Sequence, residues 1–420
     1  MSRSANGADG RTAIVIGAGI VGVCCAVSLQ RAGYAVTLIE RDQPGMACSF
    51  GNAGNIGSSS FLPYSTPGIA RRIPKMLMDK RGALKVRPGQ FLKSLPWFVR
   101  FVRAGRADRV ARIIEARRAI LTRALDAYEP LLRDAGGRDV IQAKGKLMLF
   151  ESEAAFQAVQ RDLGARRDGG ARVDVLSSDE VRQLQPGLSP SIVKGVFLPE
   201  LSHCVNPLRL TRQLLAHFLA RGGILQAAEV KGFAPRGDGP PRVMTDSGPC
   251  EASVVVLAAG VWSKALARQL GARVPVESQR GYHAMLAEPA VDIRIPLMAN
   301  ARNVLITPME EGLRCTGIAE HAGVEAAPNY ALTDLVLDHA RALIPGLRTE
   351  RVSRWMGQRP STPDSLPVIG RSPRHPGVIF AFGHGHTGLT MGAITGKLVA
   401  ELAAGGPTTI DVAPYRPDRF

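Results

Sequence analysis

The sequence predicts an α/β protein in which a parallel sheet is assembled from distant segments and a second, α+β domain is inserted between them. Three separated segments each carry a buried strand followed by a glycine-marked turn into a helix. The chain has 420 residues, more than one hydrophobic core usually supports, and 45% of them are hydrophobic, which indicates a globular fold. We therefore expect two packed domains with a small-molecule site at their junction.

The first of these units opens the chain. A buried strand is expected at Thr12–Ile16, a helix at Ile20–Arg31 and a second strand at 35–39. A helix that connects two neighbouring strands in this way makes the strands parallel. The segment therefore predicts a βαβ unit at the core of the sheet.

The turn inside this unit carries three glycines in G-x-G-x-x-G spacing. Gly17 permits the tight turn, Gly19 lets a pyrophosphate approach the backbone, and Gly22 allows the helix to pack closely on the sheet. Unpaired N–H groups and the dipole at the helix start favour phosphate groups. Glu40, 21 residues after Gly19, can accept hydrogen bonds from ribose hydroxyls, which a turn serving packing alone does not explain. The unit therefore predicts a Rossmann-like dinucleotide site.

Two later units favour FAD over NAD as the dinucleotide. Strand 253–257 precedes Ala259 and Gly260, and strand Val378–Phe382 precedes GHGHTG and a helix that runs to about residue 403. A flavin is held along its length by distant segments, whereas NAD enzymes normally need one such unit. The GHGHTG loop also aims backbone N–H groups at the negative charge that a reduced flavin carries near N1. An NAD-dependent dehydrogenase is the less favoured alternative.

The segments between the units are expected to form the second domain. Residues 73–132 are mainly helical in pattern, with an amphipathic run at 108–132, and residues 282–318 follow a strand pattern. Breaks in these strands are expected at Pro289, Pro296 and Pro308. The predicted domains are an FAD-binding domain of residues 10–65, 197–275 and 355–420, and a substrate or cap domain of residues 66–196 and 276–354.

The net charge of +17 is concentrated in one segment. Residues 71–123 contain sixteen Lys or Arg against three acidic residues, a local net charge of +13. An arginine-rich solvated helix face, or peripheral contact with an anionic membrane surface, explains this excess. Nucleic acid is not expected as a partner, because aromatic residues do not alternate with the basic ones as they do in nucleic-acid platforms.

The remaining composition favours a cytoplasmic protein, with the inner face of the cell membrane as a further location if residues 71–123 dock there. The N-terminus lacks the apolar core of a secretory signal, and no apolar stretch approaches the roughly 18 residues that cross a bilayer. The six cysteines include no C-x-x-C pair, so reduced thiols are expected. No zinc-finger spacing of His and Cys occurs, and no metal is expected.

Several motifs over almost the full chain resemble those of the D-amino acid oxidase and glycine oxidase superfamily. They are IVIGAGIVG with Glu40, ACSFGNAGNIG at 47–57, VVVLAAGVWS at 254–263, GQRPSTPDSLPVIG at 357–370 and GHGHTGLTMGAITGKLVAEL at 383–402. Within it, the combination of SFGNAGNI, RGYH, TPMEEGLRCTGIAE and GHGHTG is similar to bacterial D-amino acid dehydrogenases of the D-hydroxyproline dehydrogenase type. The resemblance implies a bound FAD.

The expected cofactor contacts come from the dinucleotide unit, from the SFGNAG segment that the resemblance places at the flavin ring, and from the two later units. They are Gly17, Ala18, Gly19, Ile20, Val21, Gly22, Glu40, Arg41, Ser49, Asn52, Ala53, Gly54, Val230, Ala259, Gly260, Gly383, His384, Gly385, Thr387, Gly388, Leu389 and Thr390.

The resemblance also implies a substrate site around Arg359, which is similar to the arginine that pairs with the substrate carboxylate. A planar guanidinium offers a bidentate match to a carboxylate, and the surrounding RPSTPD breaks regular structure and can line a site. A surface charge is the alternative. Tyr282, His283 and His386 are the other candidate substrate residues, with ordinary packing as the alternative for each. A covalent flavin link through Cys48 is not favoured.

The activity implied is FAD-dependent oxidation of a D-amino or D-imino acid, with cis-4-hydroxy-D-proline, D-proline or D-alanine as the leading substrates. A hydride passes from Cα to flavin N5, and electrons then pass to a quinone or another electron carrier. One alternative is a glycine or sarcosine oxidase that uses oxygen, and another is a flavoprotein subunit that is active only with a partner. Motif spacing does not encode the handedness of the substrate, the acceptor or the oligomeric state.

Overall fold

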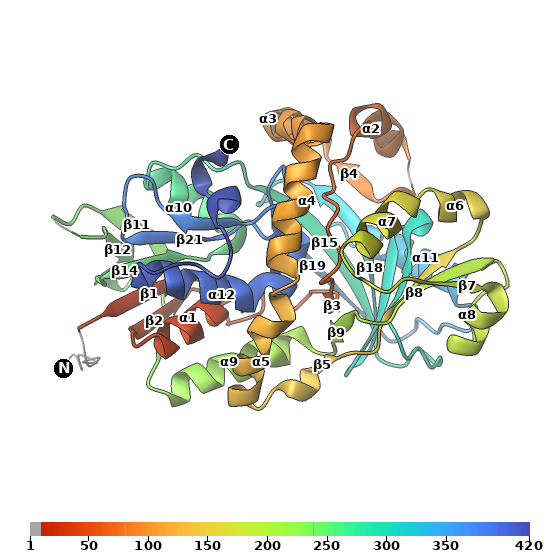
Figure 1. The fold of residues 1–420 in the computed structure, drawn as a ribbon, viewed down its shortest axis with the longest axis horizontal. Coiled ribbons are helices and arrows are strands. Elements are labelled where there is room, and N and C mark those ends of the chain that lie inside the picture. The colour runs from red at the N-terminus through yellow and green to blue at the C-terminus, as the bar shows by residue number, and fades with distance from the viewer. Residues whose placement is uncertain (1–9, 80, 238) are drawn as a thin grey trace.

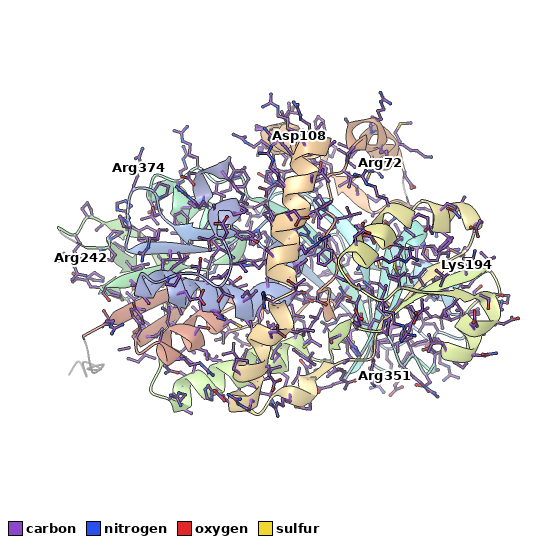
Figure 2. All side chains as sticks on the ribbon, viewed as in Figure 1. Arg72, Asp108, Lys194, Arg242, Arg351 and Arg374 are labelled. Carbon is purple, nitrogen blue, oxygen red and sulfur yellow. The ribbon has the colours of Figure 1, made fainter. Side chains whose placement is uncertain are left out.

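The computed structural model describes residues 10–79, 81–237 and 239–420 and has two lobes (Figure 1). A parallel sheet with packed helices forms one lobe, and a larger, mostly antiparallel sheet forms the other. The α/β class expected from the sequence is confirmed. Charged side chains such as Arg242, Lys194 and Arg351 project from the outer surface of both lobes (Figure 2).

The first sheet joins pieces of chain that lie far apart in sequence. Its strand order is β10-β2-β1-β14-β21-β20, and every neighbouring pair is parallel except β20 with β21. The strands span Ile224–Ala227 (β10), Ala35–Glu40 (β2), Thr12–Ile16 (β1), Val254–Leu257 (β14), Val378–Phe382 (β21) and Val368–Arg371 (β20). The three expected strands β1, β14 and β21 are direct neighbours, which brings the ends of all three units to one edge.

Helices cover one face of this sheet. They are α1 (Ile20–Arg31), α12 (Gly388–Ala404), α9 (Pro207–Ala220), α5 (Ala124–Ala135) and α4 (Ala107–Leu121). The closest pair is α1 with α12, because a Cβ at Gly396 would lie 2.5 Å from the carbonyl oxygen of Cys24. Helices α4 and α5 lie within residues 66–196, which we assigned to the second domain, yet they pack on α12. The hydroxyl of Tyr128 on α5 donates to the carbonyl of Leu389 at 2.6 Å.

The opposite face carries α10 (Ser263–Gln269) and a small antiparallel sheet of β11 (Val230–Ala234), β12 (Arg242–Thr245) and β13 (Gly248–Cys250). Their buried apolar residues, among them Val255, Leu266 and Phe380, form a core separate from the one under α1 and α12.

The second lobe is built on a nine-stranded sheet with the order β19-β15-β18-β17-β16-β6-β8-β7, and β4 pairs with β18 beside this path. The strands span Val352–Ser361 (β19), Glu277–Leu286 (β15), Gly312–His321 (β18), Val304–Met309 (β17), Leu297–Ala299 (β16), Lys146–Phe150 (β6), Lys194–Leu198 (β8), Asp174–Ser177 (β7) and Leu84–Val86 (β4). The proposed domain boundaries at 197 and 355 therefore fall inside β8 and β19.

The break expected at Pro308 is wrong, because Pro308 lies inside β17 and pairs with Leu313. The neighbouring strand β16 reaches only as far as Ile306, so β17 has a partner on one side alone at Pro308. A proline, which lacks an N–H donor, is tolerated at such an edge.

The remaining elements surround the two sheets. They are α2 (Ile69–Met78), α3 (Pro88–Ala104), α6 (Glu153–Gln157), α7 (Gln160–Asp168), α8 (Ser178–Leu184), α11 (Ala331–Leu343), and the small sheet of β3 (Asn55–Ile56), β9 (Ser202–Cys204) and β5 (Ile141–Gln142). Helices α2 and α3 lie at the upper edge of the view in Figure 1. None of the helices in the described ranges has both the length and the apolar character needed to cross a membrane.

Candidate active site

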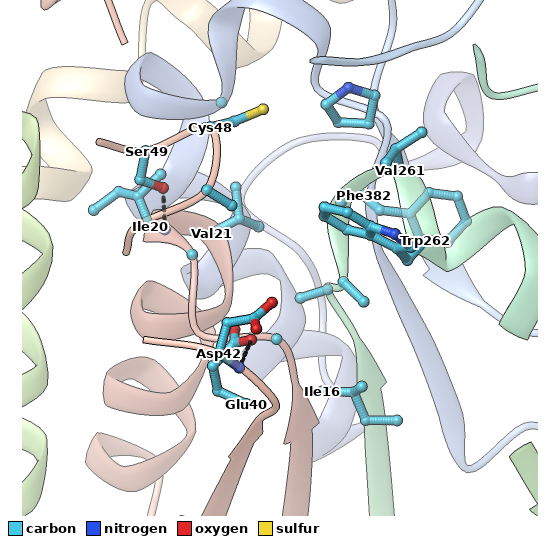
Figure 3. Close-up of a pocket in the computed structure, with 18 of the residues that line it drawn as sticks. Ile16, Ile20, Val21, Glu40, Asp42, Cys48, Ser49, Val261, Trp262 and Phe382 are labelled. Atoms are coloured by element: carbon cyan, nitrogen blue, oxygen red, sulfur yellow. Dashed lines mark hydrogen bonds between the residues drawn. The ribbon is translucent and has the colours of Figure 1, made fainter. Parts of the chain in front are cut away.

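A cavity of about 460 Å³, the long cavity, opens where the three units of the first sheet meet (Figure 3). It runs from the ends of β2 and β14 to the loop that precedes α12. The expected cofactor residues that line it are Gly17, Gly19, Ile20, Val21, Glu40, Arg41, Ser49, Asn52, Val230, Ala259, Gly260, His384, Gly385, Gly388 and Leu389. Residues contributed by segments more than 300 positions apart therefore share one hollow.

The three glycines of the first turn occupy three different environments. Gly17 has φ +102°, and a Cβ there would lie 2.7 Å from the carbonyl oxygen of Ala258. A Cβ at Gly22 would lie 1.8 Å from the carbonyl oxygen of Gly17, so α1 can pack this closely only with glycine. At Gly19 the nearest atom is the hydroxyl of Ser49 at 3.4 Å, and the backbone faces the cavity. This arrangement suits the approach of a pyrophosphate to Gly19.

Two polar side chains accept hydrogen bonds from backbone amides at this turn (Figure 3). The carboxylate of Glu40 accepts from the amide of Ala18 at 2.7 Å and from the amide of Asp42 at 3.1 Å. The hydroxyl of Ser49 accepts from the amide of Ile20 at 2.9 Å. Each carboxylate oxygen has a second lone pair, so Glu40 can still accept hydrogen bonds from ribose hydroxyls in the cavity. The residues present therefore fit an adenine dinucleotide.

A cation–π pair lies in the wall of the long cavity. The guanidinium of Arg41 lies 4.4 Å from the centre of the Trp262 ring, and both residues line the long cavity. Trp262 was not among the residues expected from sequence, although it stands in the VVVLAAGVWS motif.

Some expected contacts do not line the long cavity. They are Ala18, Gly22, Ala53, Gly54, Gly383, Thr387 and Thr390. Gly54, at φ +71°, packs its backbone on Cys204, whose amide donates to the Gly54 carbonyl at 2.7 Å. Thr390 accepts from the amide of Gly57 at 3.4 Å. These two residues hold the SFGNAG segment against β9 and α12.

A second, smaller hollow, the side recess, adjoins the long cavity across the loop before α12. Its volume is about 30 Å³, and His384 and Gly385 line both hollows. Its other lining residues are Tyr64, Trp97, Phe101, Arg117, Gln279, Ser361, Thr362, Ser365, Gly383, His386 and Thr387. No carboxylate is among them, so the side recess is aromatic, polar and uncharged except for Arg117.

Arg359 lies on β19 over the neighbouring strand β15. A Cβ at Gly281 would lie 2.1 Å from its Cζ, so the guanidinium rests directly on the glycine backbone. Burial lowers the pKa of Arg359, and the nearby Cys48 and Tyr64 act in the opposite direction. In the described ranges no carboxylate lies within 4.0 Å of its nitrogen atoms. Arg359 is half-buried, so its cation is partly desolvated without a counter-ion, and a carboxylate ligand would offset that cost.

The three histidines near Arg359 are neutral. Burial lowers the pKa of His283 and of His384 to about 3. Burial, with Arg359 and Arg117 nearby, holds the pKa of His386 well below its usual value. His283 stacks on Trp355 with ring centres 5.1 Å apart, and His384 Nε2 lies 2.9 Å from Thr395 Oγ1. These imidazoles therefore shape the site without adding charge to it.

Tyr282 does not face Arg359. Side chains alternate along a strand, so Tyr282 points to the opposite side of β15 from Gly281 and His283. Its hydroxyl donates to Glu320 Oε2 at 2.6 Å and accepts from the amide of Asn329 at 3.1 Å. Both hydrogen-bonding roles of the phenol are thus used inside the second lobe.

Tyr64 lies at the site instead. Its ring centre is 4.6 Å from that of His386, it lines the side recess, and its phenol is close enough to Arg359 for the two to affect each other's pKa. Tyr64 is 54% exposed, yet desolvation by the groups packed around its phenol is the largest effect on its pKa and raises it. No motif surrounds Tyr64 in the sequence, so pattern reasoning had no signal with which to find it.

Among the described residues, no three His, Cys, Asp or Glu side chains gather where they could bind a metal ion. Cys48 lines the long cavity, and burial raises the pKa of its thiol to about 11. A protonated thiol is a poor nucleophile, so we assign Cys48 no chemical role beyond lining the long cavity.

The chain is similar to known proteins over almost its full length. The model of the FAD-dependent oxidoreductase family matches residues 12–402. A D-amino-acid oxidase of Bradyrhizobium diazoefficiens is 37% identical over 98% of this chain and 99% of its own, and a D-amino acid dehydrogenase of Rhizobium johnstonii is 32% identical over 97% and 99%. The solved glycine oxidase of Geobacillus kaustophilus shares the fold, with a TM-score of 0.75 at 24% identity over 97% of this chain and 98% of that one.

Proposed function

Because the chain belongs to the family of FAD-dependent oxidoreductases and its relatives are D-amino acid oxidases and dehydrogenases, we propose that it oxidises a D-amino or D-imino acid with a small, uncharged side chain. The leading substrates are cis-4-hydroxy-D-proline, D-proline and D-alanine. The product is an imine, which water hydrolyses to a 2-oxo acid, or a cyclic imino acid if the substrate is proline-like.

The observation that carries this proposal is the unpaired guanidinium of Arg359. It is half-buried, its strand neighbours Gln358 and Pro360 line the long cavity, and in the described part of the chain it has no carboxylate partner. An α-carboxylate supplies the missing negative charge in a bidentate geometry. The substrate would then be anchored with its α-carbon toward the long cavity and its side chain toward the side recess.

The lining of the side recess supports the choice of a small side chain. Trp97, Phe101 and Tyr64 supply aromatic surface, and Gln279 supplies an uncharged polar group. A hydroxyl such as that of hydroxyproline can be hydrogen-bonded there, whereas a side-chain ammonium would meet Arg117 and Arg359 with no acidic residue to balance it.

Bound FAD supplies a two-electron acceptor for the hydride of the α-carbon. The protein contributes orientation, through Arg359 and Tyr64, and an environment whose histidines carry no charge. Among the described residues near Arg359, His283 and His386 have lowered pKa values and no carboxylate lies within 4.0 Å of the guanidinium, so we assign no general base. The substrate amine loses its proton to water before the oxidation.

The electron acceptor is proposed to be a quinone or a soluble carrier, with the protein in the cytoplasm and in peripheral contact with the membrane through residues 71–123. Oxygen is the second candidate, because the relative at 37% identity is named a D-amino-acid oxidase. Formation of hydrogen peroxide during turnover distinguishes the two acceptors.

An anaerobic absorbance titration of the purified holoenzyme tests the proposal. D-Alanine, D-proline, cis-4-hydroxy-D-proline, their L-enantiomers, glycine and sarcosine are added in turn, and bleaching of the flavin band is recorded. We expect a D-amino or D-imino acid to bleach the band fastest. Bleaching by glycine or sarcosine alone would instead identify a glycine-type oxidase, and a yellow protein that none of them reduces would indicate a missing partner subunit.

A further inference from the structure

Helix α2 is almost unburied although half of it is apolar. Of its ten residues, IARRIPKMLM, only Ile69 is buried. Met76, Leu77 and Met78 are exposed, and Met78 is 81% exposed. A ten-residue helix is marginal in water and normally depends on packing of an apolar face. The apolar C-terminal end of α2 is therefore not buried against another part of the described chain.

Helix α3 presents a second apolar surface at the same edge of the molecule (Figure 1). Phe91, Leu95 and Val99 recur every four residues and form one exposed stripe, and Leu92 beside them is 76% exposed. We name the seven exposed apolar residues of the two helices the α2–α3 face: Met76, Leu77, Met78, Phe91, Leu92, Leu95 and Val99.

Basic side chains surround this face. Arg71, Lys75, Lys93, Arg100 and Arg103 are exposed on the same two helices, and within the described ranges none of them has a carboxylate within 4.0 Å. Arg72, which lies at the upper edge in Figure 2, donates to the hydroxyl of Thr66. Elsewhere most surface arginines are paired, as Arg351 is with Glu288 and Arg242 with Glu251. The positive charge at this edge is therefore not neutralised within the chain.

We propose that the α2–α3 face docks on a bilayer that contains anionic lipids. A bilayer surface offers what this face presents, because its phosphate groups meet the unpaired Lys and Arg and its acyl region receives the apolar side chains between them. A nucleic acid would meet the charges but leave Met76, Met78 and Leu92 in water. The unpaired positive charges favour an anionic surface as the partner, and the exposed apolar stripe favours a lipid over a nucleic acid.

The docking helix also reaches the active site. Trp97 of α3 lines the side recess, and its Nε1 donates to the carbonyl of Ser361 at 3.1 Å. Its ring centre lies 5.4 Å from that of Phe98 and 5.2 Å from that of Phe101, and Phe98 in turn lies 6.2 Å from the exposed Phe91. Helix α3 therefore separates a lipid-soluble acceptor at the α2–α3 face from the side recess. This consequence rests on the proposed function.

Co-sedimentation of the holoenzyme with vesicles tests the docking without any turnover. Vesicles of phosphatidylcholine with phosphatidylglycerol are compared with vesicles of phosphatidylcholine alone, and we expect binding to the first alone. The double variant Lys93→Glu/Arg100→Glu should lower the partition coefficient at least about 100-fold, since each charge near an anionic surface contributes roughly fivefold. The double variant Met78→Ser/Leu92→Ser should lower it by about tenfold or more.

Matched controls lie elsewhere on the surface. Arg273→Glu/Arg374→Glu changes the net charge by the same amount, and Val175→Ser/Leu219→Ser removes apolar residues that are 44% and 40% exposed. Both controls should bind like the parent protein. Absence of binding to the anionic vesicles, or an equal loss in the controls, would overturn the proposal. So would a dimer in sedimentation velocity that the Met78→Ser/Leu92→Ser variant dissolves, because a second copy would then cover the face.

A second readout couples docking to turnover. With a D-amino acid as donor, face variants should reduce a quinone held in anionic vesicles more slowly but reduce a soluble dye at the parental rate. If no amino acid bleaches the flavin while vesicle binding persists, the proposed function fails and the docking stands. Equal rates with the vesicle quinone in parent and face variants would show that the face does not deliver electrons.

Discussion

Two glycines make room for the residue on which the proposed chemistry depends. Gly281 of β15 and Gly357 of β19 are direct partners in the sheet. Arg359 lies over the first, and the Trp355 ring lies over the second, where a Cβ would be 1.9 Å from it. The missing side chains form a trough in which a guanidinium and an indole lie flat. Arg359 can therefore occupy this position only because Gly281 has no side chain.

Replacement of Arg359 tests its role as the carboxylate anchor. Arg359→Lys keeps the charge but loses the bidentate fork, so kcat/KM should fall roughly 100-fold, about 3 kcal/mol, mostly through KM. Gly281→Ala should give a similar loss, because the new Cβ would displace the guanidinium. Steady-state kinetics of the yellow holoenzymes measure both, and Arg354→Lys on the same strand, which pairs with Asp334, serves as the control. Parental kinetics for Gly281→Ala would contradict the trough.

The two tyrosines should separate activity from stability. Tyr64→Phe keeps the ring contact with His386 but removes the hydroxyl near Arg359, so kcat/KM should fall about tenfold with little change in melting temperature. Tyr282→Phe removes the hydroxyl that donates to Glu320 and accepts from the Asn329 amide, although Glu320 keeps Arg87, and should cost about 1–3 kcal/mol of stability with kinetics unchanged. Kinetics and thermal unfolding of both variants are the measurement. The reverse pattern would restore Tyr282 to the substrate site.

Among the elements, the turn between β1 and α1 shows how one motif combines two constraints. Gly22 is required by the fold, because its missing Cβ lets α1 approach the carbonyl of Gly17. Gly19 has no such neighbour, and the space beside it belongs to the long cavity. The glycine spacing in the sequence therefore predicts one position for packing and another for ligand.

Alanine at each position should separate the two constraints. Gly22→Ala should destabilise the protein by about 3 kcal/mol or more, because α1 must move away from the sheet. Gly19→Ala should leave the apoprotein as stable as the parent but weaken FAD binding at least about tenfold, because the methyl group occupies the approach of the pyrophosphate. Chemical unfolding of the apoproteins and FAD titration by fluorescence quenching measure these effects. Gly164→Ala, where no atom lies within 4 Å, is the neutral control.

How much could be predicted from the sequence follows from the range of the interactions. Strands β1, β14 and β21 and their glycine turns were predictable, since alternation and turn chemistry are local. The placement of α4 and α5 on α12 was not, because it depends on contacts such as Tyr128 to Leu389 across more than 250 residues. Tyr64 was missed for the same reason, and Tyr282 was assigned to the substrate because its neighbours matched a motif while its strand direction was unknown.

As one fold, the protein buries several of its histidines. His283, His321 and His384 come from the two lobes, and 2%, 2% and 6% of each is exposed. Burial lowers their pKa values to about 3, 4 and 3. In the unfolded chain each imidazole returns to a pKa near 6.5. The folded protein therefore binds fewer protons than the unfolded chain between pH 6.5 and about 4.

This difference predicts that acid destabilises the protein well above the range in which carboxylates titrate. Stability should be constant with respect to these groups above pH 6.5 and fall below it, by up to about 1.4 kcal/mol per pH unit for each histidine and roughly 4 kcal/mol for the three. Urea unfolding of the apoprotein at pH 7.5, 6.5 and 5.5 measures the slope without a contribution from FAD binding. His321→Gln removes one titrating group that lies 5.4 Å, ring to ring, from Trp97 and should lower the slope by up to about 1.4 kcal/mol per pH unit. Equal stability at pH 7.5 and 5.5 would mean that these imidazoles gain protons in the fold, and an uncharged site around Arg359 would then be untenable at low pH.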